Sequence, residues 1–146
     1  MPTKKINSII DWLLEGDPAI GYCTKRDILE IDDPVMQKQI CNEGWGKQFL
    51  SLQDSRGHWG IDFYRPKWSC THYTLLEIKE MGMPKGLPTI TSIVGQILTL
   101  KKALDGGISF WQGYKHSDIC VDGMVLNYAS YFIPPDERFD SLIDLM

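Results

Sequence analysis

Hydrophobic residues recur every three to four positions along most of the chain, with polar residues between them. This spacing is typical of helices that bury one face, whereas few segments show the alternation of apolar and polar residues expected of strands. The sequence therefore predicts an all-α fold without a sheet. The helices are expected over residues 5–14, 18–31, 35–43, 68–81, 89–103, 117–132 and 136–145, with a further short helix ending at residues 49–53.

Proline, glycine and short polar residues mark the expected ends of these helices. Gly16-Asp17-Pro18 separates the first two helices. Asp33-Pro34 places a capping carboxylate before a proline at the first helical position, where the missing N–H of proline costs little. The other expected caps are Thr89 or Thr91, and Ser117 or Asp118.

The chain also matches itself when it is shifted by about fifty residues, which is the sign of a helical repeat. The matched positions are Pro34, Pro84 and Pro134; Gly57 and Gly107; Cys70 and Cys120; Leu75-Leu76 and Val125-Leu126. Each repeat would consist of a glycine turn, an inner helix, a proline break and an outer helix. Residues 1–146 are thus expected to form a single domain of approximately three helical hairpins.

An aromatic stretch, Gly44 to Leu76, carries a resemblance to a known family. Phe49-Leu50-x-x-Gln53-x-x-x-Gly57-x-Trp59-Gly60 resembles the glutamine–tryptophan motif of the squalene–hopene cyclase and protein prenyltransferase superfamily. One departure is that two residues, rather than the family's usual three, separate the leucine from the glutamine. The segment Pro66 to Leu76 resembles the start of the inner helix that follows the motif. The resemblance covers residues 44–132 well and the first 43 residues only loosely.

The resemblance implies an α/α toroid, of which this chain would form the N-terminal half only. A closed ring in this superfamily has about six hairpins, and this chain offers roughly three. Half a ring would leave an apolar end face uncovered, and such faces usually mark interaction surfaces. We therefore expect a homodimer, a second chain that completes the ring, or a truncated family member.

Composition and charge narrow the possible partners. The chain is 43% hydrophobic and 23% charged, with a net charge of −4, which argues against a nucleic-acid-binding protein. It shows no signal peptide and no apolar stretch of transmembrane length. The four cysteines form no CxxC pair and are expected to be reduced and mostly buried thiols. These features predict a cytoplasmic protein.

The family's catalytic motifs are incomplete in this chain. Its cyclases protonate an isoprenoid with an Asp-x-Asp-Asp motif, which is missing here, and Asp32-Asp33 sits where a helix cap is expected. Cyclisation by this chain alone is therefore not expected.

The protein prenyltransferases hold zinc with Asp, Cys and His, so the resemblance raises zinc as a cofactor. Val121-Asp122-Gly123-Met124 resembles their Asp-Gly-Cys segment, but methionine replaces the cysteine and is a poor zinc ligand. His116, Asp118 and Cys120 form a shifted alternative set of ligands. In the competing interpretation Asp118 caps a helix, Cys120 lies in the core and His116 is a surface residue. No cofactor is predicted, with zinc as the alternative.

Two polar residues are the predicted catalytic groups, His72 and Asp122. They correspond at the fifty-residue shift, so they would project into a shared cavity from adjacent inner helices. The alternative for His72 is a buried histidine bonded to the aromatic loop or to a backbone carbonyl. Aromatic side chains that could line the cavity and stabilise carbocations, or else pack as core, provide the substrate-binding candidates. These are Trp68, Tyr73, Trp111 and Tyr128.

Two functions follow from these observations. The first is a prenyltransferase-like or squalene cyclase-like protein that binds or transforms an isoprenoid-type apolar ligand. The second is a non-catalytic helical-repeat module for protein–protein interaction, because a fold alone is no proof of activity. A cavity with convergent polar groups would favour the first, and a filled interior with exposed apolar surface would favour the second.

Overall fold

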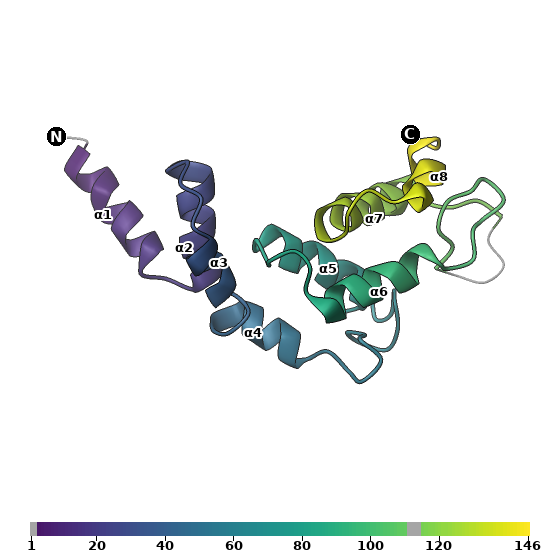
Figure 1. The fold of residues 1–146 in the computed structure, drawn as a ribbon, viewed down its shortest axis with the longest axis horizontal. Helices are drawn as coiled ribbons and strands as arrows, with labels where there is room; N and C mark the ends of the chain where they lie inside the picture. Colours follow the sequence, from purple (N-terminus) through teal and green to yellow (C-terminus); the bar gives the residue numbers. More distant parts are fainter. Residues whose placement is uncertain (1–2, 111–114) are drawn as a thin grey trace. The chain divides into compact units, whose positions relative to one another are not determined.

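The computed structural model describes residues 3–110 and 115–146, with side chains in the first helix from residue 8 onward. In these ranges the chain is helical and contains no strand, which confirms the all-α prediction; one isolated antiparallel bridge joins Lys102 and Ile108 (Figure 1). The α-helices are α1 Thr3–Leu14, α2 Pro18–Cys23, α3 Pro34–Gln39, α4 Gly44–Ser51, α5 Thr71–Glu80, α6 Pro88–Leu98, α7 Ile119–Phe132 and α8 Asp140–Ile143. A π-helical turn, η1 Thr24–Ile28, and a 3₁₀ turn, η2 Glu137–Phe139, complete the set.

Carboxylates begin several of these helices as the sequence predicts. Asp33 Oδ1 accepts a hydrogen bond from the Met36 N–H at 2.9 Å before α3, and Asp118 Oδ1 accepts one from the Cys120 N–H at 3.2 Å before α7. These contacts satisfy backbone donors that lack a partner inside the helix. The predicted cap of α6 is wrong, because the helix begins at Pro88 and therefore includes both Thr89 and Thr91.

Several predicted helices are shorter than expected, among them those predicted over residues 35–43, 89–103 and 136–145, and for two others the backbone shows the reason. In place of the helix predicted over residues 18–31, the structure has α2 followed by the π-helical turn η1. Glu30, just beyond η1, has a left-handed φ of +57°. The helix predicted from residue 68 begins only at Thr71, because Trp68 has a left-handed φ of +76°. A left-handed φ is incompatible with a right-handed helix, and it is sterically unfavourable for residues other than glycine. The helices therefore cannot extend through Glu30 or Trp68.

The chain divides into two compact units, and the prediction of a single domain stays a prediction. Unit 1 comprises residues 1–52 and 80–84, with α2 packed against α1, α3 and α4. Its small core centres on Tyr22, Ile40 and Met83. The Gln37 side chain donates to the Gly82 carbonyl at 3.0 Å, and Gly82, at φ +76°, lies against the Tyr22 ring where a Cβ would not fit. These contacts fix the 80–84 segment within unit 1.

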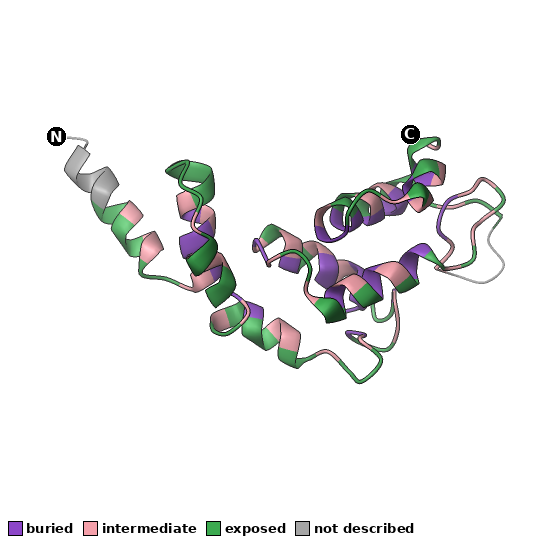
Figure 2. Cartoon of the chain, viewed as in Figure 1, coloured by how far each residue is buried: buried purple, intermediate pink, exposed green. Residues whose placement is uncertain are grey.

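Unit 2 comprises residues 53–79 and 85–146, and its core is larger. α7 packs against α6 and α8, and the buried faces of α5, α6 and α7 are visible in Figure 2. Buried positions on α5 recur on α7 at the predicted fifty-residue spacing. The corresponding pairs are Thr71 and Val121, His72 and Asp122, Leu75 and Val125, and Ile78 and Tyr128.

The glycine turns before α5 and α7 share a hydrogen-bond pattern. The Asp54 N–H donates to the His58 carbonyl at 2.8 Å, and the Ala103 N–H donates to the Gly107 carbonyl at 2.9 Å. Gly57 and Gly106 take left-handed φ values of +88° and +95°. Gly106, rather than Gly107 as predicted, therefore corresponds in conformation to Gly57. The two turns are alike, while the larger repeat and toroid remain predictions.

Candidate functional site

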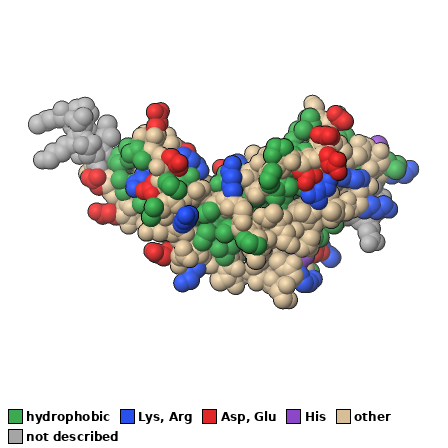
Figure 3. Space-filling view, viewed as in Figure 1, with side chains coloured by type: hydrophobic (Ala, Val, Ile, Leu, Met, Phe, Trp, Pro, Cys, Tyr) green, Lys and Arg blue, Asp and Glu red, His purple; other side chains and the backbone are tan. Residues whose placement is uncertain are grey.

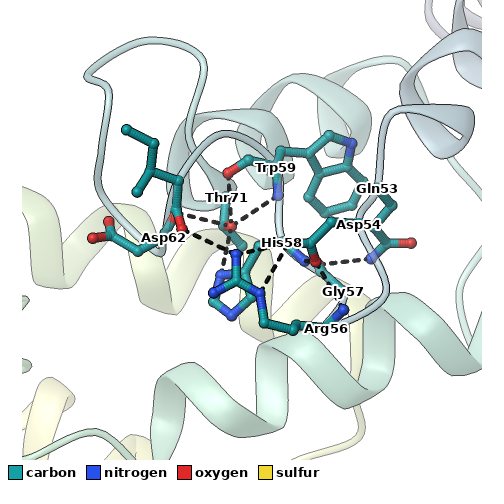
Figure 4. Close-up of polar contacts among 9 residues, drawn as sticks. Gln53, Asp54, Arg56, Gly57, His58, Trp59, Asp62 and Thr71 are labelled. Atoms are coloured by element: carbon teal, nitrogen blue, oxygen red, sulfur yellow. Dashed lines mark hydrogen bonds and ion pairs between the residues drawn. The ribbon is translucent and has the colours of Figure 1, made fainter.

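The turn that resembles the glutamine–tryptophan motif is a closed network of polar contacts (Figure 4). Gln53 Nε2 donates to the Gly57 carbonyl at 2.9 Å, and Thr71 Oγ1 accepts from the N–H of the buried Trp59 at 3.1 Å. Asp54 accepts from the backbone N–H groups of His58 and Arg56. The His58 N–H and then the Arg56 guanidinium lower the pKa of Asp54 to about 2. The glutamine and tryptophan thus have structural roles in this turn.

An aromatic cluster surrounds His72, and we call it the His72 cluster: Tyr64, Trp68, His72, Tyr73, Phe110 and Tyr128. The His72 ring centroid lies 4.9 Å from that of Tyr73 and 5.6 Å from that of Tyr128. Trp68 joins the cluster through Tyr73, at 4.8 Å between centroids. The structure thus brings together four of the predicted site residues. Trp111 lies outside the residues that the structure describes.

His72 is fully buried and uncharged near neutral pH. Burial lowers its pKa to about 4, because a charged imidazolium would be desolvated among aromatic rings. Its Nδ1 lies 3.3 Å from the Tyr128 hydroxyl, while Nε2 is buried without a hydrogen-bond partner. Neither His72 nor Tyr128 has any surface open to water, so no water-sized space borders either side chain. As it stands, this histidine cannot exchange protons with a ligand held beside it.

Asp122 has a separate set of partners. Its Oδ1 accepts a hydrogen bond from the Ile108 N–H at 2.8 Å, so the carboxylate fastens the second glycine turn to α7. Thr71 fastens the first glycine turn to α5 in the same way, because its hydroxyl accepts a hydrogen bond from the Trp59 N–H. Oδ2 is buried without a hydrogen bond and lies against Gly107. The polar contacts of Asp122 are therefore those of a structural clamp, and none of them joins it to the His72 cluster.

The three weak metal candidates have other contacts. Asp118 caps α7 and also accepts from the Cys120 thiol at 2.8 Å, while the exposed His116 ring lies 3.7 Å from Asp105 Oδ2. No group of three His, Cys, Asp or Glu side chains suited to a metal ion occurs within residues 3–110 and 115–146. The interpretation of Cys120 as a core residue is wrong, because its side chain is exposed. All four cysteines are free thiols, and Cys70 is the buried one.

Exposed apolar side chains on unit 1 form a feature that the sequence analysis did not locate. Trp12 on α1, Val35 on α3 and Leu52, which directly follows α4, are each at least 70% exposed. Figure 3 shows hydrophobic side chains on the visible surface of this unit, with acidic side chains among them. The full set, which we call the unit 1 apolar surface, is Ile9, Trp12, Ile28, Leu29, Ile31, Val35, Trp45 and Leu52. Large apolar side chains at these exposed positions are candidates for contact with a partner, because covering them removes apolar area from water.

Other surfaces of the described chain give less support for a functional site. A pocket of about 410 Å³, lined by Lys85, Tyr131 and Pro134 among others, contains none of the predicted site residues. No helix in the part of the chain that the structure describes has the length and apolar character needed to cross a membrane. The unit 1 apolar surface and the His72 cluster are therefore the two features that bear on function.

Comparisons with protein-family models, with curated proteins and with solved structures found no match to this chain. The resemblance to the cyclase and prenyltransferase superfamily accordingly rests on the motif residues around Gln53 and Trp59.

Proposed function

We propose that this chain is a non-catalytic helical-repeat module that binds another protein through the unit 1 apolar surface. The observation that carries the proposal is the exposure of Trp12, Val35 and Leu52, together with five further large apolar residues on the same unit. When a partner covers exposed side chains of this size, the free energy of the complex falls by roughly 25 cal/mol per Å² of apolar area removed from water. Tryptophan is also enriched among the residues that dominate binding energy at interfaces.

The buried state of the predicted catalytic residues supports the same proposal. His72 is enclosed by aromatic rings and Asp122 holds a backbone N–H, so both are engaged in internal packing. A reaction centre needs its acid or base within reach of a substrate proton. An interior filled in this way favours the interaction module over a cavity for an isoprenoid.

The architecture that we propose for this module is the helical repeat of the squalene cyclase and prenyltransferase type. The matching turns at Gly57 and Gly106, and the matching buried faces of α5 and α7, support it. A partial ring of such repeats would present apolar surface for a homodimer or for a second chain that completes the ring.

A second candidate function is the binding of an isoprenoid-type apolar ligand at the His72 cluster. Two observations favour it. Trp68 is 72% exposed beside Tyr73 and has a strained left-handed backbone, and the buried Nε2 of His72 lacks a hydrogen-bond partner. Strained backbone and unsatisfied buried groups are features that often occur at functional sites. A ligand would have to displace packed rings to reach His72.

A matched pair of triple variants tests the proposed function. Trp12→Ser/Val35→Ser/Leu52→Ser removes exposed apolar groups from unit 1, and Ile61→Ser/Leu104→Ser/Ile119→Ser removes exposed apolar groups from unit 2. The chain of residues 1–146 is incubated with an extract of its source cells, and complexes are analysed by lysine cross-linking and mass spectrometry. We expect cross-links at Lys38 and Lys47 of unit 1, lost in the first variant and kept in the second.

The proposed function is tested by comparing the cross-linked complexes that the two triple variants form. Circular dichroism should show that both triple variants keep the helical content of the wild type, because all six positions are exposed. Complexes that survive the unit 1 substitutions, or that disappear only with the unit 2 substitutions, would contradict the proposed function.

A further inference from the structure

The segment between α2 and α3 is an ordered loop, which we call the 25–33 loop. Its first half is the π-helical turn η1, closed by a hydrogen bond from the Leu29 N–H to the Thr24 carbonyl at 3.1 Å. The Ile31 N–H donates to the Lys25 carbonyl at 2.9 Å, and the Lys25 ammonium pairs with Asp33 at 2.6 Å. Contacts between its two ends thus hold the loop in one conformation.

This held loop presents apolar side chains to water. Ile28 is 57% exposed, Leu29 37% and Ile31 50%. Between them Glu30 has a left-handed φ of +57°, a conformation that L side chains other than asparagine and aspartate rarely adopt. The loop holds three aliphatic residues in solvent in a fixed conformation. A partner that covers them would therefore cause little further loss of conformational entropy in the loop, which favours binding.

Acidic groups accompany these aliphatic residues. Within the described part of the chain, neither Glu30 nor Asp32 forms an ion pair, and both are exposed. Unit 1 as a whole carries nine acidic and six basic side chains. The loop therefore combines exposed aliphatic groups with uncompensated negative charge, and a surface of this kind favours partners of opposite charge.

We infer that the 25–33 loop docks a basic amphipathic segment of a partner protein, with leucine-type side chains on Ile28, Leu29 and Ile31 and lysine or arginine beside Glu30 and Asp32. This inference rests on the proposed function and specifies the chemistry of the partner. The apolar contacts supply the affinity, whereas the acidic groups steer the encounter and select against acidic segments.

A synthetic peptide tests the inference on the chain of residues 1–146. The probe is a fluorescently labelled 14-residue helical peptide of leucine and lysine, and its control has glutamate in place of every lysine. Binding is followed by fluorescence anisotropy at two salt concentrations. We expect saturable binding of the lysine peptide alone, weakened about tenfold when salt is raised, because exposed charge pairs are screened.

Variants locate the binding surface. Leu29→Ser/Ile31→Ser and Glu30→Lys/Asp32→Lys should each weaken binding of the lysine peptide by about tenfold or more, since each removes a central part of the contact. The matched controls in unit 2, Ile61→Ser/Leu104→Ser and Glu77→Lys/Glu137→Lys, should change affinity by less than about twofold. Because the substituted positions are exposed, the variants should keep the wild-type helical content, and circular dichroism checks this.

Several results would overturn the inference. Equal binding of the glutamate peptide, or equal weakening by the unit 2 controls, would mean that association is nonspecific. A concentration-dependent dimer in sedimentation experiments, dissociated by the loop variants, would identify a second copy of this chain as the occupant. If the loop variants bind normally while Trp12→Ser/Val35→Ser/Leu52→Ser does not, the docking loop is wrong and the proposed function still stands.

Discussion

Acidification from pH 7 to pH 4 is expected to lower the free energy of unfolding by about 3 kcal/mol through His72 alone, and His72→Phe is expected to remove that loss. The folded-state pKa of His72 is depressed by burial from 6.5 to about 4. In this window the unfolded chain takes up a proton that the folded chain cannot. Stability contributed by the neutral imidazole is therefore complete above pH 6.5 and is lost as the pH falls toward 4.

The measurement is chemical denaturation of the wild type, His72→Phe and His116→Phe across this pH range. His116 is the matched control because its side chain is exposed. Burial also lowers the pKa of His58, but that contribution is common to all three proteins and cancels in the comparison. At pH 7 the His72→Phe variant should lie within about 1 kcal/mol of the wild type, because removal of the unsatisfied Nε2 offsets the loss of the hydrogen bond to the buried Tyr128 hydroxyl. Equal acid sensitivity of wild type and His72→Phe would contradict a buried neutral histidine.

Gly107→Ala is expected to destabilise unit 2 by about 3 kcal/mol, at the upper end of the cost of overpacking. A Cβ at this position would overlap Ser117 Oγ and Asp122 Oδ2, both of which lie against the glycine. Asp122 would have to move, and its hydrogen bond to the Ile108 N–H would weaken. The steric reason here is close approach of side chains, because Gly107 does not have a left-handed φ.

Gly95→Ala is the control for Gly107→Ala. Gly95 lies inside α6 with open space where a Cβ would be, so alanine should stabilise the protein by about 0.5–1 kcal/mol through helix propensity. Urea denaturation measures both variants. If Gly107→Ala is neutral, or if Asp122→Ala destabilises the Gly107→Ala variant as much as it destabilises the wild type, the clamp between Asp122 and the second glycine turn is wrong.

Features of the fold that depend on neighbouring residues were predictable from the sequence. Helical spacing and the Asp33-Pro34 start signal act within one turn of helix, and the start of α3 and its cap are found where they were expected, although the helix ends at Gln39 rather than near residue 43. The left-handed conformation of Trp68 was not predictable, because tryptophan has no preference for it and the surrounding loop imposes it. The start of α5 was placed too early for that reason.

The candidate site was predictable in part. His72, Tyr73 and Tyr128 do lie together, since the fifty-residue spacing and helical periodicity place them on buried helix faces. The role of Asp122 depends on a hydrogen bond to Ile108 across a loop, and no local pattern signals such a contact. The exposure of Trp12 and Val35 depends likewise on how much core unit 1 can form, because apolar spacing alone does not tell a buried helix face from an uncovered one.

The central claim is that the interior around His72 is packed core and that binding occurs on unit 1. Nuclear magnetic resonance of the isotopically labelled chain, residues 1–146, titrated with farnesol, tests this claim most directly. The account predicts that the ring signals of His72 and Tyr128 show no saturable shift, because neither side chain has surface open to a ligand. Saturable shifts of both rings, with His72 Nε2 gaining a hydrogen bond, would contradict the account and establish the isoprenoid site instead.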